Sequence, residues 1–480
     1  MKEEKILTKT FISTQLKISK TQTLENLNFT VAIINPLSLY SKFITNLIPL
    51  SQGTHALIQM FDSTSEVAVP ETPPTKRINL GETENEEEEE DRLSNLPESL
   101  ILHTLSFLNT KHAVQTSVLS TRWKHLWKRL PALTLHSADF GAYKKFTRLV
   151  SKVLSLRDSS ISLHSLDFKR TNGRFEPALK KIVNYAISHN VQRLGLCFNG
   201  DIAQIPPTMF SCRTLTHLKL SIYNGGRGHE TPFPKSLNLP ALTDLQLGNF
   251  AFEVDDNGCA EPFSTFNKMN SLLICNCTVM GATANLYISS VTLVNLTIYN
   301  HRYDKCDFYQ IHLFTPSLCK FVFNGTPYLQ LSGSNVSSLK HVDIDVEVEL
   351  YQKDSLVFLI SWLIEFANIK SLTVSATTLQ ALSLYPNLLK IKLPSLHNLK
   401  SLVVKIDELS YGFRMTLMDA KVEKAKSKRE AARIRKAFKA GLEPSSPIPD
   451  GIVDFLKQNS PFAKVEYIDC SMRRYRERYI

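Results

Sequence analysis

The side chains best suited to chemistry in this 480-residue chain are its 13 histidines and 8 cysteines. A metal or catalytic site needs several such groups at set spacings, as in C-x-x-C or H-E-x-x-H, because all of them must reach one point. Neither spacing occurs, and the phosphate-binding G-x-x-x-x-G-K-[ST] and nucleophile-elbow G-x-S-x-G motifs are missing too. The glycines at 225, 226 and 228 are predicted to lie in a loop inserted between repeats. We therefore expect no catalytic residue, no metal and no cofactor, and we predict that the chain is not an enzyme.

The cysteines are scattered through apolar patterns, which favours buried thiols in a reducing compartment. Cys275 and Cys277 are two residues apart and are expected on the same face of one strand. The opening sequence has no secretory signal, and polar residues interrupt the apolar patches of 29–50, so we predict no membrane span. The expected location is the nucleus, the cytoplasm or both. The cysteines are Cys197, Cys212, Cys259, Cys275, Cys277, Cys306, Cys319 and Cys470.

Residues 91–131 offer a different kind of chemistry, which is the docking of another protein. Asn95 can cap a helix, Glu98 can reach back to the free amide, and Pro97 suits the first turn, so a helix is predicted from about Leu96. Apolar residues recur at helical spacing in three short runs, followed by a tryptophan pair flanked by arginine and lysine. Three helices within about 40 residues bury little surface, so a partner or the rest of the chain should cover what is left.

The patterns LPxxLIxxxLSFL and SVLSTRWxxLW in this segment resemble the F-box, the domain that docks substrate receptors onto the Skp-family adaptor of SCF ubiquitin ligases. The alternative is a small helical bundle with an ordinary core. The resemblance implies nine residues that contact or shape the adaptor interface: Leu96, Pro97, Leu100, Ile101, Leu105, Leu108, Val118, Leu119 and Trp123.

Downstream, the pattern apolar-x-x-apolar-x-apolar recurs ten times between Leu163 and Leu399, 236 residues apart over nine intervals. The mean spacing near 26 lies in the leucine-rich-repeat range, and stacked units would pair their short strands into a parallel sheet. Leu130/Leu133/Leu135 are predicted to add a first strand and Phe462/Val465/Tyr467 a last one. The units begin at Leu163, Val191, Leu215, Leu242, Leu272 (with Cys275 and Cys277), Leu293, Leu318, Leu339, Ile369 and Leu399.

The asparagine of the standard repeat is replaced by other residues, such as Tyr223, Phe250 and Met280, so its regular ladder is not visible. The whole layout nevertheless resembles the plant F-box/leucine-rich-repeat family. The predicted fold class is α/β: a short three-helix F-box at 91–131, then an irregular, horseshoe-like leucine-rich-repeat solenoid of parallel strands at 132–470. An ordinary α/β domain with leucine-rich strands is the alternative.

Residues 1–90 fit no domain and are expected to be a disordered leader that ends in an acidic run. The alternative for the first 59 residues is a spurious upstream translation, with Met60 as the true start. At the other end, basic residues at 421–439 outnumber acidic ones by seven, and those of the tail 471–480 by three, out of a formal net charge of +11. Residues 420–440 are predicted to form one exposed basic helix inserted between repeats, without a strong apolar row.

The function that the family resemblance implies is a substrate-recognition subunit. Its F-box would bind a Skp-family adaptor, and through it a cullin, while the repeats hold the protein to be ubiquitinated. Catalysis would then be proximity supplied in trans. The alternative is a nucleic-acid or chromatin-associated scaffold that uses the basic helix. If the chain is a substrate-recognition subunit, nucleic acid is not an expected partner.

Overall fold

The computed structural model describes residues 96–140, 143–170, 176–223, 231–234, 237–281, 285–301, 309–327, 329–332, 337–347, 353–366, 368–385, 387–393, 396–444 and 446–470. The leader at 1–90, Asn95, the glycine cluster, Cys306 and the basic tail lie outside these residues. The chain divides into two compact units, one of residues 1–170 and 185–191 and the other of 171–184 and 192–480.

The first unit begins with a short helical segment that differs in detail from the prediction. Its first helix starts at Glu98, because Pro97 occupies the N-cap with extended backbone rather than the first turn. The third predicted helix is only a 3-10 turn around the tryptophans. The elements are α4 (Glu98–Ser106), α5 (Thr110–Gln115), η1 (Thr116–Val118) and η2 (Leu126–Arg129).

A pair of parallel strands completes the first unit. β1 (Ala132–His136) pairs with β2 (Ser165–Arg170), so that Leu133 lies beside Leu166 and Leu135 beside Phe168. These four side chains are buried, which confirms the strand predicted after Leu130. The unit also contains η3 (Ser137–Asp139) and α6 (Tyr143–Leu156). The next helix, α7 (Glu176–Ser188), starts among the residues of the second unit and ends among those of the first.

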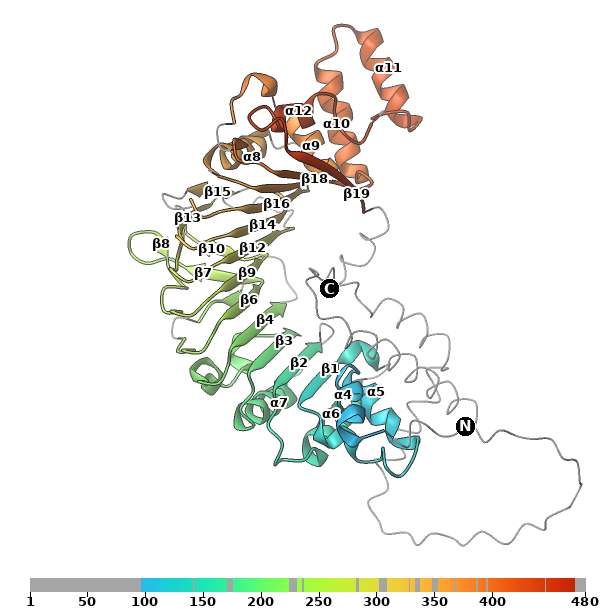
Figure 1. Ribbon diagram of the computed structural model, residues 1–480, viewed down its shortest axis with the longest axis vertical. Coiled ribbons are helices and arrows are strands. Elements are labelled where there is room, and N and C mark those ends of the chain that lie inside the picture. Colours follow the sequence, from blue (N-terminus) through green and yellow to red (C-terminus); the bar gives the residue numbers. More distant parts are fainter. Residues whose placement is uncertain are drawn as a thin grey trace, which may run out of the picture. The chain divides into compact units, whose positions relative to one another are not determined.

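The second unit is built on a long parallel sheet, and Figure 1 shows its strands side by side in chain order. This confirms the α/β class and the stacked parallel strands. In this unit the described strands of that sheet are β3 (Arg193–Asn199), β4 (His217–Tyr223), β6 (Asp244–Gly248), β9 (Ser271–Cys275), β12 (Asn295–Asn300), β14 (Lys320–Gly325), β16 (His341–Val346), β17 (Ser371–Ser375), β18 (Ser401–Ile406) and β19 (Lys464–Asp469).

The repeat register is regular except at one predicted unit. In β9 the buried residues are Leu272 and Ile274, which pair with Leu245 and Leu247 of β6. The unit therefore begins at Met269, and the predicted Leu272/Cys275/Cys277 register is wrong. β9 ends at Cys275, which is half-buried, and Asn276 follows with a left-handed backbone (φ 51°). The two cysteines thus do not share one strand face.

Two smaller parallel sheets, which the repeat pattern did not predict, belong to the same unit. Buried aromatic side chains pack around the three-stranded sheet, including a cluster of Phe233, Phe252 and Phe263 with ring centroids 5.4–6.3 Å apart. The three-stranded sheet holds β10 (Thr278–Met280), β7 (Phe250–Glu253) and β5 (Thr231–Pro232). The four-stranded sheet holds β15 (Leu329–Ser332), β13 (Tyr309–Phe314), β11 (Asn285–Ser289) and β8 (Cys259–Ala260).

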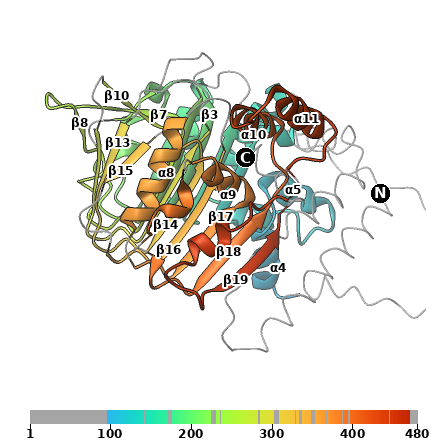
Figure 2. The same ribbon diagram turned by 90° about the horizontal axis from the view of Figure 1, so that it is seen from above.

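Helices cover the later strands of the long sheet, as Figure 2 shows for α8 (Lys353–Glu365) and α9 (Ala376–Ser383). Trp362 of α8 is fully buried, with its ring 4.7 Å from that of Phe323 in β14. The short turns η4 (Ile202–Gln204) and η5 (Pro207–Ser211) lie between β3 and β4, and η6 (Leu388–Lys390) lies between α9 and β18.

At the C-terminal end the structure differs from the sequence prediction in two ways. The single basic helix predicted at 420–440 is a pair of helices, α10 (Tyr411–Glu423) and α11 (Lys428–Lys439), inserted between β18 and β19 and followed by α12 (Ile452–Leu456). The predicted last unit does supply β19, in which Val465 pairs with Leu402. Its first residue, Phe462, is nevertheless 98% exposed, because among the described residues no later strand covers this end.

Candidate functional site

Helix α4 carries apolar residues on two sides. Ile101 and Leu105 are fully buried and hold the helix to its own bundle, whereas Leu100 is 43% exposed and Phe107, just after the helix, is 72% exposed. Positions 100 and 107 are seven residues, or about two helical turns, apart, so they lie on one side of the segment. Leu96 and Leu108 are half-buried. A short helix that keeps apolar surface in water after folding has the composition of a binding surface.

A second group of exposed apolar residues comes from η1. Thr116 Oγ1 donates to the carbonyl of Ala113 (2.7 Å), and the Ser117 hydroxyl donates to that of Val114. These bonds compete with helical ones and tighten the chain into a 3-10 turn. Val118 is then 55% exposed, and Leu119 is half-buried. The exposed apolar set, as we call it below, is Leu96, Pro97, Leu100, Phe107, Leu108, Val118 and Leu119.

The structure therefore divides the nine residues predicted from the sequence. Leu96, Pro97, Leu100, Leu108, Val118 and Leu119 are at least partly accessible. Ile101, Leu105 and Trp123 are buried, with Trp123 only 2% exposed, and can only shape the surface from beneath. Phe107 is the residue that the sequence reasoning left out, although it stands within the quoted LSFL motif.

Polar contacts fix the position of α4. The Arg122 guanidinium donates to the Leu96 carbonyl, and Arg129 forms an ion pair with Glu98 in the first turn. Both arginines flank the tryptophan pair, whose rings are buried. The start of α4 is thus tied to the last turn of the segment, which limits the ordering that a partner would have to impose.

Helix α5 anchors the segment to the strand that follows. Asn109 caps α5 by accepting from the amide of His112 (2.9 Å), and Thr110 Oγ1 accepts from the amide of Thr134 in β1 (2.8 Å). Lys111 Nζ donates to the Asp139 carbonyl (2.7 Å) and lies 5.3 Å from the centre of the Phe140 ring. These contacts join the bundle to β1 as one folded body.

Burial also changes the titration of two groups in α5. It lowers the pKa of Lys111, and Asp139 opposes this effect. The pKa of His112 is lowered first by burial and then by the positive charge of Lys111. His112 is therefore neutral at neutral pH, and protonating it would place a second cation beside Lys111.

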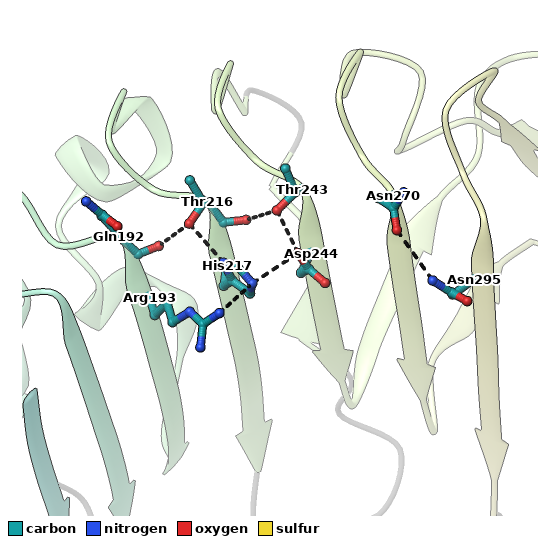
Figure 3. A network of polar contacts seen from close by, with 8 residues as sticks. All are labelled: Gln192, Arg193, Thr216, His217, Thr243, Asp244, Asn270 and Asn295. Carbon is teal, nitrogen blue, oxygen red and sulfur yellow. Dashed lines mark hydrogen bonds and ion pairs between the residues drawn. The ribbon is translucent and has the colours of Figure 1, made fainter. Parts of the chain in front are cut away.

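The long sheet of the second unit offers a separate, polar surface. Figure 3 shows its strand starts, where His217 lies between Arg193 and Asp244 on three neighbouring strands. His217 Nε2 is 3.3 Å from the Arg193 guanidinium and 3.2 Å from Asp244 Oδ2, while Thr216 Oγ1 is 2.9 Å from Nδ1. At the starts of the next two strands, the side-chain amide of Asn295 donates a hydrogen bond to Asn270 Oδ1 (3.4 Å). Charged and amide groups in rows of this kind can select a protein partner.

Further along the same face, Lys405 of β18 forms an ion pair with Asp343 of β16 at 2.8 Å. Gly248, two strands before Asn295, lies so close to Ser221 that an added Cβ would meet its Oγ at 2.5 Å. This face is therefore an ordered polar surface with defined neighbours and not a set of free side chains.

Among the described residues, no group of three or more His, Cys, Asp or Glu side chains is placed to hold a metal ion. Within the same residues, no helix combines the length and apolarity needed to cross a bilayer. Cys197, Cys212 and Cys277 are buried free thiols, and Cys259, Cys275, Cys319 and Cys470 are partly accessible.

Comparison with known proteins finds a matching domain family and several similar proteins. The F-box domain family matches residues 93–134. An F-box/FBD/LRR-repeat protein of Arabidopsis thaliana is 34% identical over 178 residues, which cover 34% of this chain and 37% of the relative. A second such protein from the same organism is 28% identical over 304 residues, covering 62% and 64%. A protein named as a putative F-box/FBD/LRR-repeat protein is 26% identical over 360 residues, covering 67% and 76%. The chain thus spans less than two thirds of the length of the first two relatives.

Proposed function

We infer that this chain, which belongs to the plant F-box/leucine-rich-repeat proteins, is the substrate-recognition subunit of an SCF-type ubiquitin ligase. One observation carries the proposal: a folded F-box segment keeps the exposed apolar set in water, with Phe107 and Val118 more than half exposed. A Skp-family adaptor would cover this set and connect the chain to a cullin.

The energetics favour a small number of dominant contacts. Large side chains at the centre of an interface often account for about 2 kcal/mol or more each when truncated. Phe107 and Leu100 are the largest accessible members of the set. The buried Ile101, Leu105 and Trp123 would act indirectly, by holding α4 in its position.

The parallel-strand unit would bind the protein that is to be ubiquitinated. Its outward strand face, with Arg193, His217 and Asp244 at its start, provides charge and amide groups for selection. In this scheme the chain is a non-catalytic adaptor that raises the local concentration of a substrate lysine near the conjugating enzyme. We propose that it acts in the nucleus, the cytoplasm or both.

The test is a titration of the purified full chain with a Skp-family adaptor by calorimetry. Leu100→Asp would bury an unpaired carboxylate in the interface, and Phe107→Ala would remove the largest contact. We expect each to weaken binding by about thirtyfold or more, since about 2 kcal/mol corresponds to that factor.

Leu389→Asp is the matched control, because Leu389 is 66% exposed but lies in the second unit. It should bind the adaptor like the unchanged chain. If both F-box variants stay folded and also bind like the unchanged chain, the adaptor-docking role of this surface is wrong.

A further inference from the structure

Helix α11 carries a cationic surface that the proposed function does not use. Figure 1 shows α11 on the outer side of α10 at the C-terminal end of the second unit. Six of its side chains are basic and exposed, and we call them the basic face: Lys428, Arg429, Arg433, Arg435, Lys436 and Lys439.

The opposite side of α11 is apolar and already occupied. Ala431 and Ile434 are half-buried and Phe438 is buried, at the spacing of one helix side. Lys421 of α10 lies 5.6 Å from the centre of the Phe438 ring and forms an ion pair with Glu443 at 2.6 Å. The sequence prediction of a helix without a strong apolar row is therefore wrong for α11. Because this row faces α10, the basic face is fixed toward solvent.

Both ends of α11 are well defined. Ser427 Oγ accepts from the amide of Glu430 (3.2 Å), and the Glu430 carboxylate accepts from the amide of Lys426 (2.8 Å), one residue before the N-cap, in a variant of the capping box. Gly441, with φ +73°, ends the helix, and the amide of Leu442 donates to the Ala437 carbonyl (2.9 Å). The six cations are therefore held on a helix with both ends capped.

The charge of the basic face is uncompensated. Glu430 is the one acidic residue within α11, and it is engaged at the cap. In the part of the chain that the structure describes, none of the six cations forms an ion pair. Arg429 and Arg433 are four residues apart, as are Arg435 and Lys439, and like charges at this spacing destabilise a helix. Binding a polyanion would remove this repulsion.

The density of the charge indicates which polyanion fits. The eleven steps from Lys428 to Lys439 span about 16 Å at about 1.5 Å per residue, which gives about one cation every 3 Å. Duplex DNA carries about one phosphate charge per 1.7 Å of its axis, a density of the same order.

The chemistry of the face argues against other occupants. It has no aromatic ring, on which the bases of a single strand would stack. It has no large apolar side chain to insert into a bilayer or to anchor a protein interface. An α-helix about 10–12 Å across also matches the major groove of B-form DNA, which is about 12 Å wide.

We propose that the basic face of α11 binds the phosphate backbone of duplex DNA, as a second interaction surface independent of the F-box. Contacts to phosphates carry no base information, so the binding is not sequence-specific.

The test is a fluorescence-anisotropy titration of the full chain with a 30-base-pair labelled DNA duplex at several salt concentrations. If all six cations contact phosphates, the slope of log affinity against log salt is about −5, and affinity falls about a thousandfold between 50 and 200 mM salt. The variant Arg429→Gln/Arg433→Gln/Lys436→Gln should halve that slope.

The matched control is Lys180→Gln/Lys181→Gln/Lys268→Gln, which removes the same formal charge from exposed lysines elsewhere. It should leave the slope unchanged, and both variants should bind the Skp-family adaptor normally. The proposal is overturned if the α11 variant keeps the full slope, if the control lowers it equally, or if phosphatidylserine vesicles or polyglutamate compete as well as unlabelled duplex.

Discussion

At the scale of single residues, Asn300 and Gly325 show how neighbouring repeats are locked together. Asn300 is buried. Its side-chain amide donates to the Thr326 backbone carbonyl (3.1 Å), and its backbone carbonyl accepts from the Thr326 backbone amide (2.8 Å). Gly325 has φ +121°, and a Cβ there would lie 2.0 Å from the Asn300 oxygen. Only glycine fits this position.

Gly325→Ala should therefore lower the free energy of unfolding by more than about 3 kcal/mol, through strain and a backbone clash. Urea unfolding of the purified chain measures this. Gly412→Ala in α10 is the control, because an added Cβ there meets nothing within 4 Å. It should be neutral or slightly stabilising, and equal effects of the two substitutions would contradict the assigned packing.

His112 gives a prediction for pH. Its folded-state pKa lies below the ordinary 6.5, so the unfolded chain binds the proton more readily. The contribution of His112 to stability is then fully present above about pH 6.5 and is lost as the pH falls through the lowered folded-state pKa. In thermal melts between pH 7.5 and 5.5, His112→Gln should lose less stability than the unchanged chain. An identical loss in both would mean that His112 does not contribute.

At the scale of elements, Trp362 is the largest of the side chains that α8 buries. Trp362 is buried, with its ring 4.7 Å from that of Phe323 and 6.3 Å from that of Phe321. Trp362→Ala should cost about 3–5 kcal/mol of unfolding free energy, because it leaves a cavity. Val357→Ala, on the same helix at a position that is 51% exposed, should cost less than about 0.5 kcal/mol. Comparable losses in urea unfolding would show that Trp362 is not the anchor.

The strands could be predicted from the sequence where the apolar pattern fits only one register. Leu215, Leu218 and Leu220 are flanked by polar residues, so their inward direction follows directly. Around Cys275 the sequence LLICNC fits two registers, because cysteine is as apolar as its neighbours. The left-handed turn at Asn276 decides between them, and the spacing alone carries no sign of it.

The helix pair at the C-terminus was predictable in part. Its basic character is plain in the sequence, but the break between α10 and α11 depends on Ser427 and Glu430, which together cap the start of α11. That S-x-x-E signal was present and was hidden within a lysine-rich run. The two smaller sheets depend on contacts between loops of different repeats, which no local pattern encodes.

At the scale of the whole molecule, the proposed function uses separate surfaces for separate tasks. The exposed apolar set on the F-box would bind the adaptor, and the outward polar face of the long sheet would bind the substrate. The sequence motif predicts the first surface, yet it could not tell which of the nine residues remain accessible. Burial of Ile101, Leu105 and Trp123 depends on how the three short segments pack, which only the structure resolves.

Proximity labelling in cells with the unchanged chain and with Leu100→Asp tests the central claim most directly. We expect the variant to lose the Skp-family adaptor and the cullin from its labelled neighbours while candidate substrates are retained or accumulate. If the variant still labels the adaptor and cullin at the level of the unchanged chain, the exposed apolar set does not connect this protein to a ubiquitin ligase.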